Sequence, residues 1–175
     1  MITLKNISNL FTTALFIVFL SACGNKKQEA INAPEGMSVL DLSKYGKPFT
    51  IFVPDTLATK PEITEQSSGA LEIKSGKNFA ISINEQAADI EMKKQDVKSD
   101  EINKLKNFIT DEPTAILWES EITKSEFHFL VNQKIGNTDY SFSEINDSDA
   151  NPFGKDAIQK MFDAAKNTKP ISREK

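Results

Sequence analysis

The sequence predicts an α+β domain whose antiparallel sheet, of about six or seven strands, is backed by two main helices. Several short segments alternate apolar and polar residues, as strands with one covered face do. Two other segments carry apolar residues at helical spacing, and each begins near a residue that can cap a helix. The predicted order is three strands, a helix, three or four strands and a second helix, which indicates an antiparallel sheet with helices packed on it.

The first three predicted strands are short segments with period-two alternation. In "FTIFV" (49–53) the apolar side chains at alternate positions share one face, and Pro54 ends the strand. The segments "LEIKS" (71–75) and "FAISI" (79–83) are separated by "GKN", a composition typical of a hairpin connection. We therefore expect the second and third strands to pair in antiparallel fashion.

The middle of the chain begins with a helix and then allows two interpretations. Asp89 can cap a helix at about 88–99. The side that this helix would bury consists of Ile90, Lys94 and Val97. Residues 100–110 either continue the helix or form a strand that turns at "DEPT" and pairs with "AILWESEI". The turn signal favours the strand.

The last predicted strands, "EFHFLVNQKIG" and "TDYSFSEI", are joined around Gly136 and Asn137. One face of the first strand carries Phe127, Phe129 and Val131, and the other carries Glu126, His128 and Leu130. A final helix follows, with Asn151 as its cap and Pro152 in its first turn. Its apolar side consists of Ile158, Met161, Phe162 and Ala165, and Pro170 ends it.

Composition excludes several classes of function. The chain of 175 residues has a formal net charge of −4 and contains one cysteine and one histidine. Because a mildly acidic protein without a basic stripe repels phosphate backbones, we expect no nucleic-acid partner. One cysteine cannot form an internal disulfide, and one histidine cannot build a multi-histidine zinc site. We therefore expect neither a metal nor a cofactor.

The N-terminus contains the parts of a secretory signal. Residues 1–9 carry one positive charge, residues 10–20 are apolar apart from two threonines, and two small residues follow. The apolar run has about 11 residues, whereas a helix needs roughly 20 to span a bilayer. A cleaved signal is therefore favoured over a permanent transmembrane helix.

The residues Leu20, Ser21, Ala22 and Cys23 follow the apolar run and resemble the lipobox of bacterial lipoproteins. The resemblance covers about the first 24 residues. It implies that a dedicated signal peptidase recognises the three residues before Cys23, that the Cys23 thiol carries a diacylglycerol group, and that the new amino group is acylated. The alternative is an ordinary signal peptide with an incidental cysteine.

The lipobox resemblance also implies a location. The membrane becomes a partner through the lipid anchor on Cys23, because each buried acyl methylene contributes about 0.8 kcal/mol. In this family an aspartate directly after the cysteine often signals inner-membrane retention. Gly24 stands there in this chain, which implies the outer membrane, with the domain facing the periplasm or the cell surface.

The signal sequence and the residue patterns divide the chain into four predicted regions. Residues 1–22 are the predicted signal peptide, 23–36 the lipidated cysteine and a flexible tether, 37–170 a single α+β globular domain, and 171–175 a polar tail. The tether is polar, contains Pro34 and two glycines, and spans on the order of 20 Å.

Three features of the mature chain resemble the Mog1/PsbP-like α/β sandwich. They are "YGKPFTIFVP" (45–54), the strand-then-helix order, and "YSF" (140–142) before the final helix. The resemblance covers most of the mature chain. Proteins with this fold are mostly accessory or binding modules, so the resemblance implies a binding domain without catalytic groups.

His128 is the main candidate for acid–base chemistry. In a strand it lies near Glu126, on the face opposite the neighbouring phenylalanines. A histidine and a carboxylate on one face can transfer protons or hold a metal. Because no second histidine or thiol can join them, we expect a solvated strand face instead.

The segment "NDSDANPFG" resembles the start of a calcium loop, with Asp147, Asp149 and Asn151 at alternate positions. Its sixth position is Pro152 where the loop needs glycine, and its twelfth is Ile158 where the loop needs glutamate. A capped helix start therefore explains these acids better.

Two other patterns in the strand that follows "DEPT" have structural explanations. Glu119 and Glu121 are two residues apart and could share a strand face, where carboxylates can act as a catalytic pair. We expect instead an exposed strand edge kept soluble by charge. Trp118, the one tryptophan, is expected in or at the core rather than at a binding surface.

Together these observations predict a lipid-anchored envelope lipoprotein that acts as a non-catalytic binding or accessory module for an envelope protein or a small ligand. The titratable side chains are too few to indicate a convergent catalytic site. Two alternatives stay open. One is an envelope acid–base enzyme or hydrolase that uses His128 with Glu126 or Glu119, and the other is a purely structural or stress-related lipoprotein.

Overall fold

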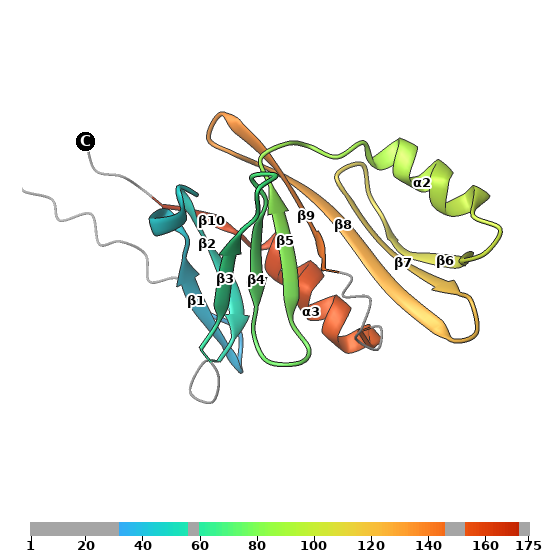
Figure 1. Cartoon of the computed structure of the whole chain (residues 1–175), viewed down its shortest axis with the longest axis horizontal. Coiled ribbons are helices and arrows are strands. Elements are labelled where there is room, and N and C mark those ends of the chain that lie inside the picture. Colours follow the sequence, from blue (N-terminus) through green and yellow to red (C-terminus); the bar gives the residue numbers. More distant parts are fainter. Residues whose placement is uncertain (1–31, 56–59, 146–152, 172–175) are drawn as a thin grey trace, which may run out of the picture. The chain divides into compact units, whose positions relative to one another are not determined.

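The computed structural model describes residues 32–55, 60–145 and 153–171 (Figure 1). They belong to one compact unit that begins at Asn32. The predicted signal peptide, Cys23 and the acidic segment with Asp147 and Asp149 lie outside the described residues.

Two antiparallel sheets and two α-helices confirm the predicted α+β fold (Figure 1). The larger sheet has seven strands in the order β3-β4-β5-β9-β8-β7-β6, and the smaller has the order β1-β2-β10. The strands of the larger sheet are β3 (Glu62–Glu65), β4 (Leu71–Lys74), β5 (Ala80–Asn84), β6 (Lys104–Asp111), β7 (Ala115–Glu121), β8 (Ser125–Ile135) and β9 (Thr138–Glu144). The smaller sheet consists of β1 (Met37–Asp41), β2 (Phe49–Pro54) and β10 (Lys169–Pro170). The helices are α2 (Ile90–Ser99), α3 (Lys155–Lys166) and the 3-10 turn η1 (Ser43–Tyr45).

Two tight hairpins set the register of the larger sheet. β4 pairs with β5, and β8 pairs with β9, both in antiparallel fashion. Each connection contains a glycine with a φ of 63°, Gly76 in the first and Gly136 in the second. A positive φ favours glycine because it has no Cβ. Both predicted hairpin connections are confirmed.

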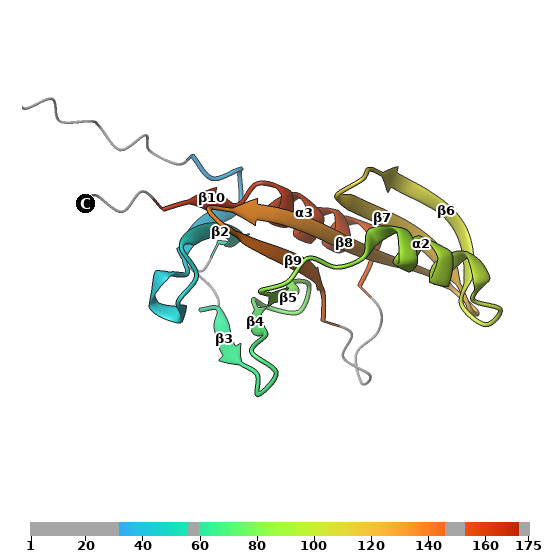
Figure 2. The same ribbon diagram turned by 90° about the horizontal axis from the view of Figure 1, so that it is seen from above.

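The larger sheet buries side chains on both faces. Ala115 and Leu117 of β7 belong to the main core, which also contains residues of α3, β2, β4 and β5. Ile116 and Trp118 alternate with them and belong to a second cluster with Ile90 and Val97 of α2. Because successive side chains of a strand point to opposite faces, α3 and α2 cover opposite faces, on either side of β8 in Figure 2.

Helix α2 follows its prediction closely. Asp89 is the N-cap, and its Oδ1 accepts a hydrogen bond from the backbone N–H of Met92 at 2.9 Å. The buried residues of the helix are Ile90, Lys94 and Val97, as predicted. Residues from Lys104 onward form strand β6, which confirms the strand interpretation of this segment.

The predicted start of α3 is wrong. The helix begins at Lys155, with Gly154 as an N-cap that makes no side-chain hydrogen bond, rather than near Asn151 and Pro152. Glycine is acceptable at an N-cap, and Phe153 packs against the main core just before it. The predicted apolar side is buried and consists of Ile158, Met161, Phe162 and Ala165.

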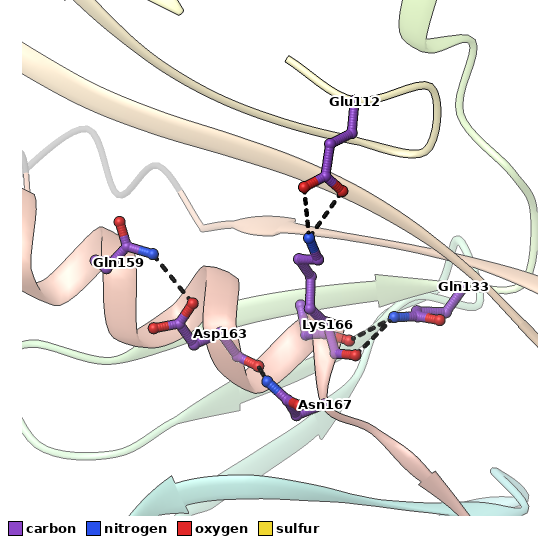
Figure 3. A network of polar contacts seen from close by, with 7 residues as sticks. Glu112, Gln133, Gln159, Asp163, Lys166 and Asn167 are labelled. Carbon is purple, nitrogen blue, oxygen red and sulfur yellow. Dashed lines mark hydrogen bonds and ion pairs between the residues drawn. The ribbon is translucent and has the colours of Figure 1, made fainter. Parts of the chain in front are cut away.

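Polar side chains fix the C-terminal end of α3 (Figure 3). Lys166 Nζ contacts both carboxylate oxygens of Glu112, from the β6–β7 turn, at 2.8 and 2.7 Å. Gln133 of β8 donates to the backbone carbonyl of Lys166 at 2.9 Å, and Asn167 Nδ2 donates to the carbonyl of Asp163 at 2.8 Å. The bond from Gln133 satisfies a carbonyl that the helix end leaves without a backbone partner. No helix in the described part of the chain is long and apolar enough to cross a membrane.

Candidate functional site

A pocket of about 450 Å³ lies between α2 and the sheet face that α2 covers. Its wall comes from α2 and the turn after it, and its floor comes from β7, β8 and β9. The lining residues are Lys93, Val97, Asp100, Asn103, Trp118, His128, Phe129, Leu130, Ser143 and Glu144. This volume falls within the range of small-molecule sites, roughly 300–1,000 Å³.

The wall of the pocket follows from helical spacing. Lys93, Val97 and Asp100 lie on one side of α2 because they are four and three residues apart. Asp100 ends the helix, and its Oδ1 accepts hydrogen bonds from the backbone N–H groups of Ile102 and Asn103, both at 2.9 Å. These bonds, with Asn103 the larger contributor, lower the pKa of the Asp100 carboxyl.

Strand register builds the floor. His128 pairs with Trp118, and Leu130 pairs with Ser143, so these four side chains lie on one face of three adjacent strands. Ser143 of β9 has a short side chain, pairs with Leu130 and lines the pocket.

The centre of the floor is a stacked pair of rings. The Trp118 and His128 ring centroids are 5.2 Å apart with an interplanar angle of 29°. Trp118 is 5% exposed, which confirms the expected core position, and His128 is 8% exposed. The prediction of a solvated face around His128 is therefore wrong, because α2 and Trp118 cover this part of β8.

Glu144 holds the His128 ring in place. His128 Nδ1 lies 2.8 Å from Glu144 Oε1, and Glu144 Oε2 accepts the backbone N–H of Phe129 at 2.9 Å. The predicted partner, Glu126, is a weaker contact, with its Oε2 3.9 Å from His128 Nε2.

The role of Glu144 was missed, and the sequence contains no direct signal for it. The β8–β9 hairpin pairs Ile135 with Thr138 across its turn. Counting back from that pair places Glu144, the last residue of β9, beside Phe129, on the strand face opposite His128 by alternation.

Glu119 does not join this site. It lies on the other face of β7, since it alternates with Trp118. Lys106 Nζ of β6 lies 2.9 Å from Glu119 and 3.3 Å from Glu121, and Ser125 Oγ donates to Glu119 at 2.7 Å. Lys106 and then Ser125 lower the pKa of the Glu119 carboxyl. The expectation of an edge strand here is also wrong, because β7 lies between β6 and β8.

Two polar atoms of the pocket residues are buried without a hydrogen-bond partner among the described residues. They are Nε2 of His128 and Oδ1 of Asn103. Most buried polar atoms in folded proteins are paired, so these two atoms are exceptions. In the described part of the chain, no three His, Cys, Asp or Glu side chains are grouped to hold a metal.

Comparison with protein family models, with curated proteins and with solved structures gives no match for this chain. The geometry of the pocket is therefore the basis for assigning a function.

Proposed function

We propose that this chain is a lipid-anchored envelope protein whose domain binds a small polar ligand in the pocket between α2 and the sheet. The observation that carries the proposal is the pocket itself: an aromatic floor of Trp118 and His128, with the charged residues Lys93 and Asp100 in its lining. Mostly preformed concave sites with a few polar groups are typical of ligand binding.

Binding is favoured over catalysis because His128 and Glu144, the pair in the pocket that could transfer protons, contact each other. One carboxylate oxygen of Glu144 lies 2.8 Å from His128 Nδ1, and the other accepts a hydrogen bond from the Phe129 backbone. The other ring nitrogen, His128 Nε2, is buried. A general base must reach the proton that it removes, so this arrangement supports a rigid binding floor.

The anchor is proposed from the sequence alone. Cys23 follows an apolar run and small residues, and the first strand of the domain begins at Met37. The polar residues 24–36 lie between them in the sequence. The tether would hold the pocket near the membrane and leave it open to solutes of the envelope.

Binding can be tested by equilibrium dialysis of the purified chain against a small-molecule extract of bacterial envelopes. Ser143→Phe fills the pocket from its floor. Thr64→Phe is the matched control, because Thr64 lies on the same sheet face at the exposed edge strand β3. We expect wild type and Thr64→Phe to retain the same molecule and Ser143→Phe to lose it. Equal retention by all three proteins would place binding elsewhere.

The anchor can be tested by fractionating membranes from cells that express Cys23→Ala. We expect this variant to lose both membrane association and incorporation of labelled palmitate, because the acceptor thiol is gone. Ser21→Ala keeps a small residue before the cut site and should behave as wild type. Unchanged membrane association of Cys23→Ala would contradict the lipid anchor.

One observation favours a second candidate, an acid–base enzyme. His128 and Glu144 are 2.8 Å apart in a pocket, the geometry of a histidine oriented by a carboxylate. In this case the protein hydrolyses at least one member of a panel of chromogenic esters, amides and glycosides. The His128→Gln and Glu144→Gln variants would then lose that activity together. A wild-type protein without turnover on the panel would argue for binding alone.

A further inference from the structure

We propose that the ligand is a zwitterion of about dipeptide length, whose carboxylate contacts Lys93 and whose ammonium contacts Asp100. This inference rests on the proposed function and adds the chemical class of the ligand. Its basis is the distribution of unpaired charge and unpaired acceptors around the pocket.

Lys93 supplies the contact for an anion. Its Nζ lies 5.6 Å from the centroid of the Trp118 ring, and it forms no hydrogen bond or ion pair with a carboxylate in the described part of the chain. The next residue differs, because Lys94 Nζ contacts Asp111 at 2.5 Å and Glu91 at 2.8 Å. A ligand carboxylate at Lys93 would therefore gain a cation that no protein carboxylate contacts directly, although the charge of Lys93 also acts on Asp100.

Asp100 supplies the contact for an ammonium group. Asp100 Oδ1 is bonded to two backbone N–H groups, while its second oxygen has no hydrogen bond among the described residues. An ammonium group has three donors and no acceptor, so it can pair with that second oxygen. The hydrogen bonds from Asn103 and Ile102 lower the pKa of the Asp100 carboxyl.

The spacing of the two contacts sets the length of the ligand. Lys93 and Asp100 are seven residues apart along α2 and its C-cap, or about 10 Å along the helix axis. The lysine side chain is long and can shorten this distance. Two to three extended peptide residues span about 7–10 Å. Glycine alone is too short to bridge both ends, whereas a dipeptide or tripeptide can do so.

The test is calorimetric titration of the purified full chain with glycine, diglycine and triglycine. Two capped probes, N-acetyl-diglycine and diglycine amide, remove one charge each. We expect diglycine or triglycine to bind at least tenfold more tightly than glycine and than either capped probe. Tenfold corresponds to about 1.4 kcal/mol.

Variants assign each end of the ligand. Lys93→Met should bind diglycine amide, which lacks the carboxylate, as weakly as it binds diglycine. Asp100→Asn should bind N-acetyl-diglycine, which lacks the ammonium, as weakly as it binds diglycine. Asparagine can still accept the two backbone hydrogen bonds that shape the turn. Lys98→Met and Asp96→Asn are matched controls on α2, because neither residue lines the pocket, and both should bind as wild type.

Two results would overturn the zwitterion and leave the proposed function in place. One is that wild type binds capped and uncapped probes with equal affinity and that Ser143→Phe abolishes this binding. The other is retention of a neutral or singly charged molecule in the dialysis experiment, again lost in Ser143→Phe. If neither the probes nor the extract yields binding that Ser143→Phe removes, both proposals fail together.

Discussion

Glu144 orients the His128 ring through two contacts made by one carboxylate. One oxygen holds the ring nitrogen, and the other holds the backbone of the adjacent residue, Phe129. Its side chain is only 10% exposed, so water competes little for these bonds. The same residue therefore fixes the floor of the pocket and closes the end of the β8–β9 pairing.

We expect Glu144→Gln to lower the free energy of unfolding by about 1–2 kcal/mol, because hydrogen bonds to a charged group are stronger than neutral ones. Urea unfolding followed by Trp118 fluorescence measures this directly, since Trp118 is stacked on His128. Glu126→Gln is the matched control. Its oxygen lies 3.9 Å from the ring, so its effect should be smaller, and the opposite ranking would contradict the assigned role of Glu144.

At this scale the sequence predicted which face each residue occupies, but not which partner it has. The alternation of Phe127, His128 and Phe129 placed His128 on the face opposite the phenylalanines, as observed. The nearest carboxylate along the chain, Glu126, was taken as its partner. The stronger partner comes from a neighbouring strand, and it depends on a hairpin register that residue types do not encode directly.

Helix α2 forms one wall of the pocket and has a modest apolar contact with the sheet. Of its ten residues, three are buried, so its stability also depends on its ends. The Asp89 cap satisfies the N–H of Met92 at one end. At the other end, Asp100 satisfies two backbone N–H groups of the following turn.

Removing the cap should loosen the wall. We expect Asp89→Ala to destabilise the protein by about 1 kcal/mol and to speed hydrogen exchange in α2, whereas Asp89→Ser should retain most of the stability. Hydrogen exchange with mass spectrometry locates the effect. Exchange that rises equally in α3 would mean that the cap stabilises the fold as a whole rather than this helix.

Ion pairs whose strength depends on pH link β6, the edge strand of the larger sheet, to its neighbour β7. Lys106 of β6 contacts Glu119 and Glu121 of β7. Because the pKa of Glu119 in the folded protein is lower than its usual value of 4.5, its contribution to stability is present above that value. It is lost as the pH falls through the lower folded pKa.

We therefore expect Glu119→Gln to reduce the loss of stability between about pH 5 and pH 3. Urea midpoints measured across this range give the comparison. Glu65→Gln, which removes an exposed carboxylate from β3, is the control and should leave the wild-type slope unchanged. If both variants follow the wild-type curve, Lys106 does not stabilise the ionised form of Glu119.

Prediction of elements from sequence succeeded where periodicity and a capping residue agreed. Asp89 and the spacing of Ile90, Lys94 and Val97 predicted α2 correctly. The start of α3 failed, because the strong capping residues of "NDSDANP" outweighed Gly154 in the prediction. Strands β1, β3 and β10 were not predicted, since they are short or carry mixed residues and depend on pairing with strands distant in sequence.

The larger sheet separates two apolar layers of unequal size. The main core contains residues of both sheets and α3, whereas the second cluster has four buried residues, two from α2 and two from β7. Val97 and Trp118 of this second cluster line the pocket, so a ligand there contacts the smaller layer.

Adjacent residues of β7 can separate the two layers. Ile116 and Leu117 are 0% and 1% exposed and lie on opposite faces. We expect either change to alanine to cost about 2–5 kcal/mol. Hydrogen exchange should rise mainly in α2 for Ile116→Ala and mainly in α3 for Leu117→Ala. The same exchange pattern in both variants would show that the layers unfold as one unit.

The central claim is that the pocket between α2 and the sheet binds a small molecule. Dialysis against an envelope extract, followed by mass spectrometry of what the protein retains, tests it most directly. The account predicts one retained species for wild type and Thr64→Phe and none for Ser143→Phe. Retention of the same species by Ser143→Phe, or by none of the three proteins, would contradict it.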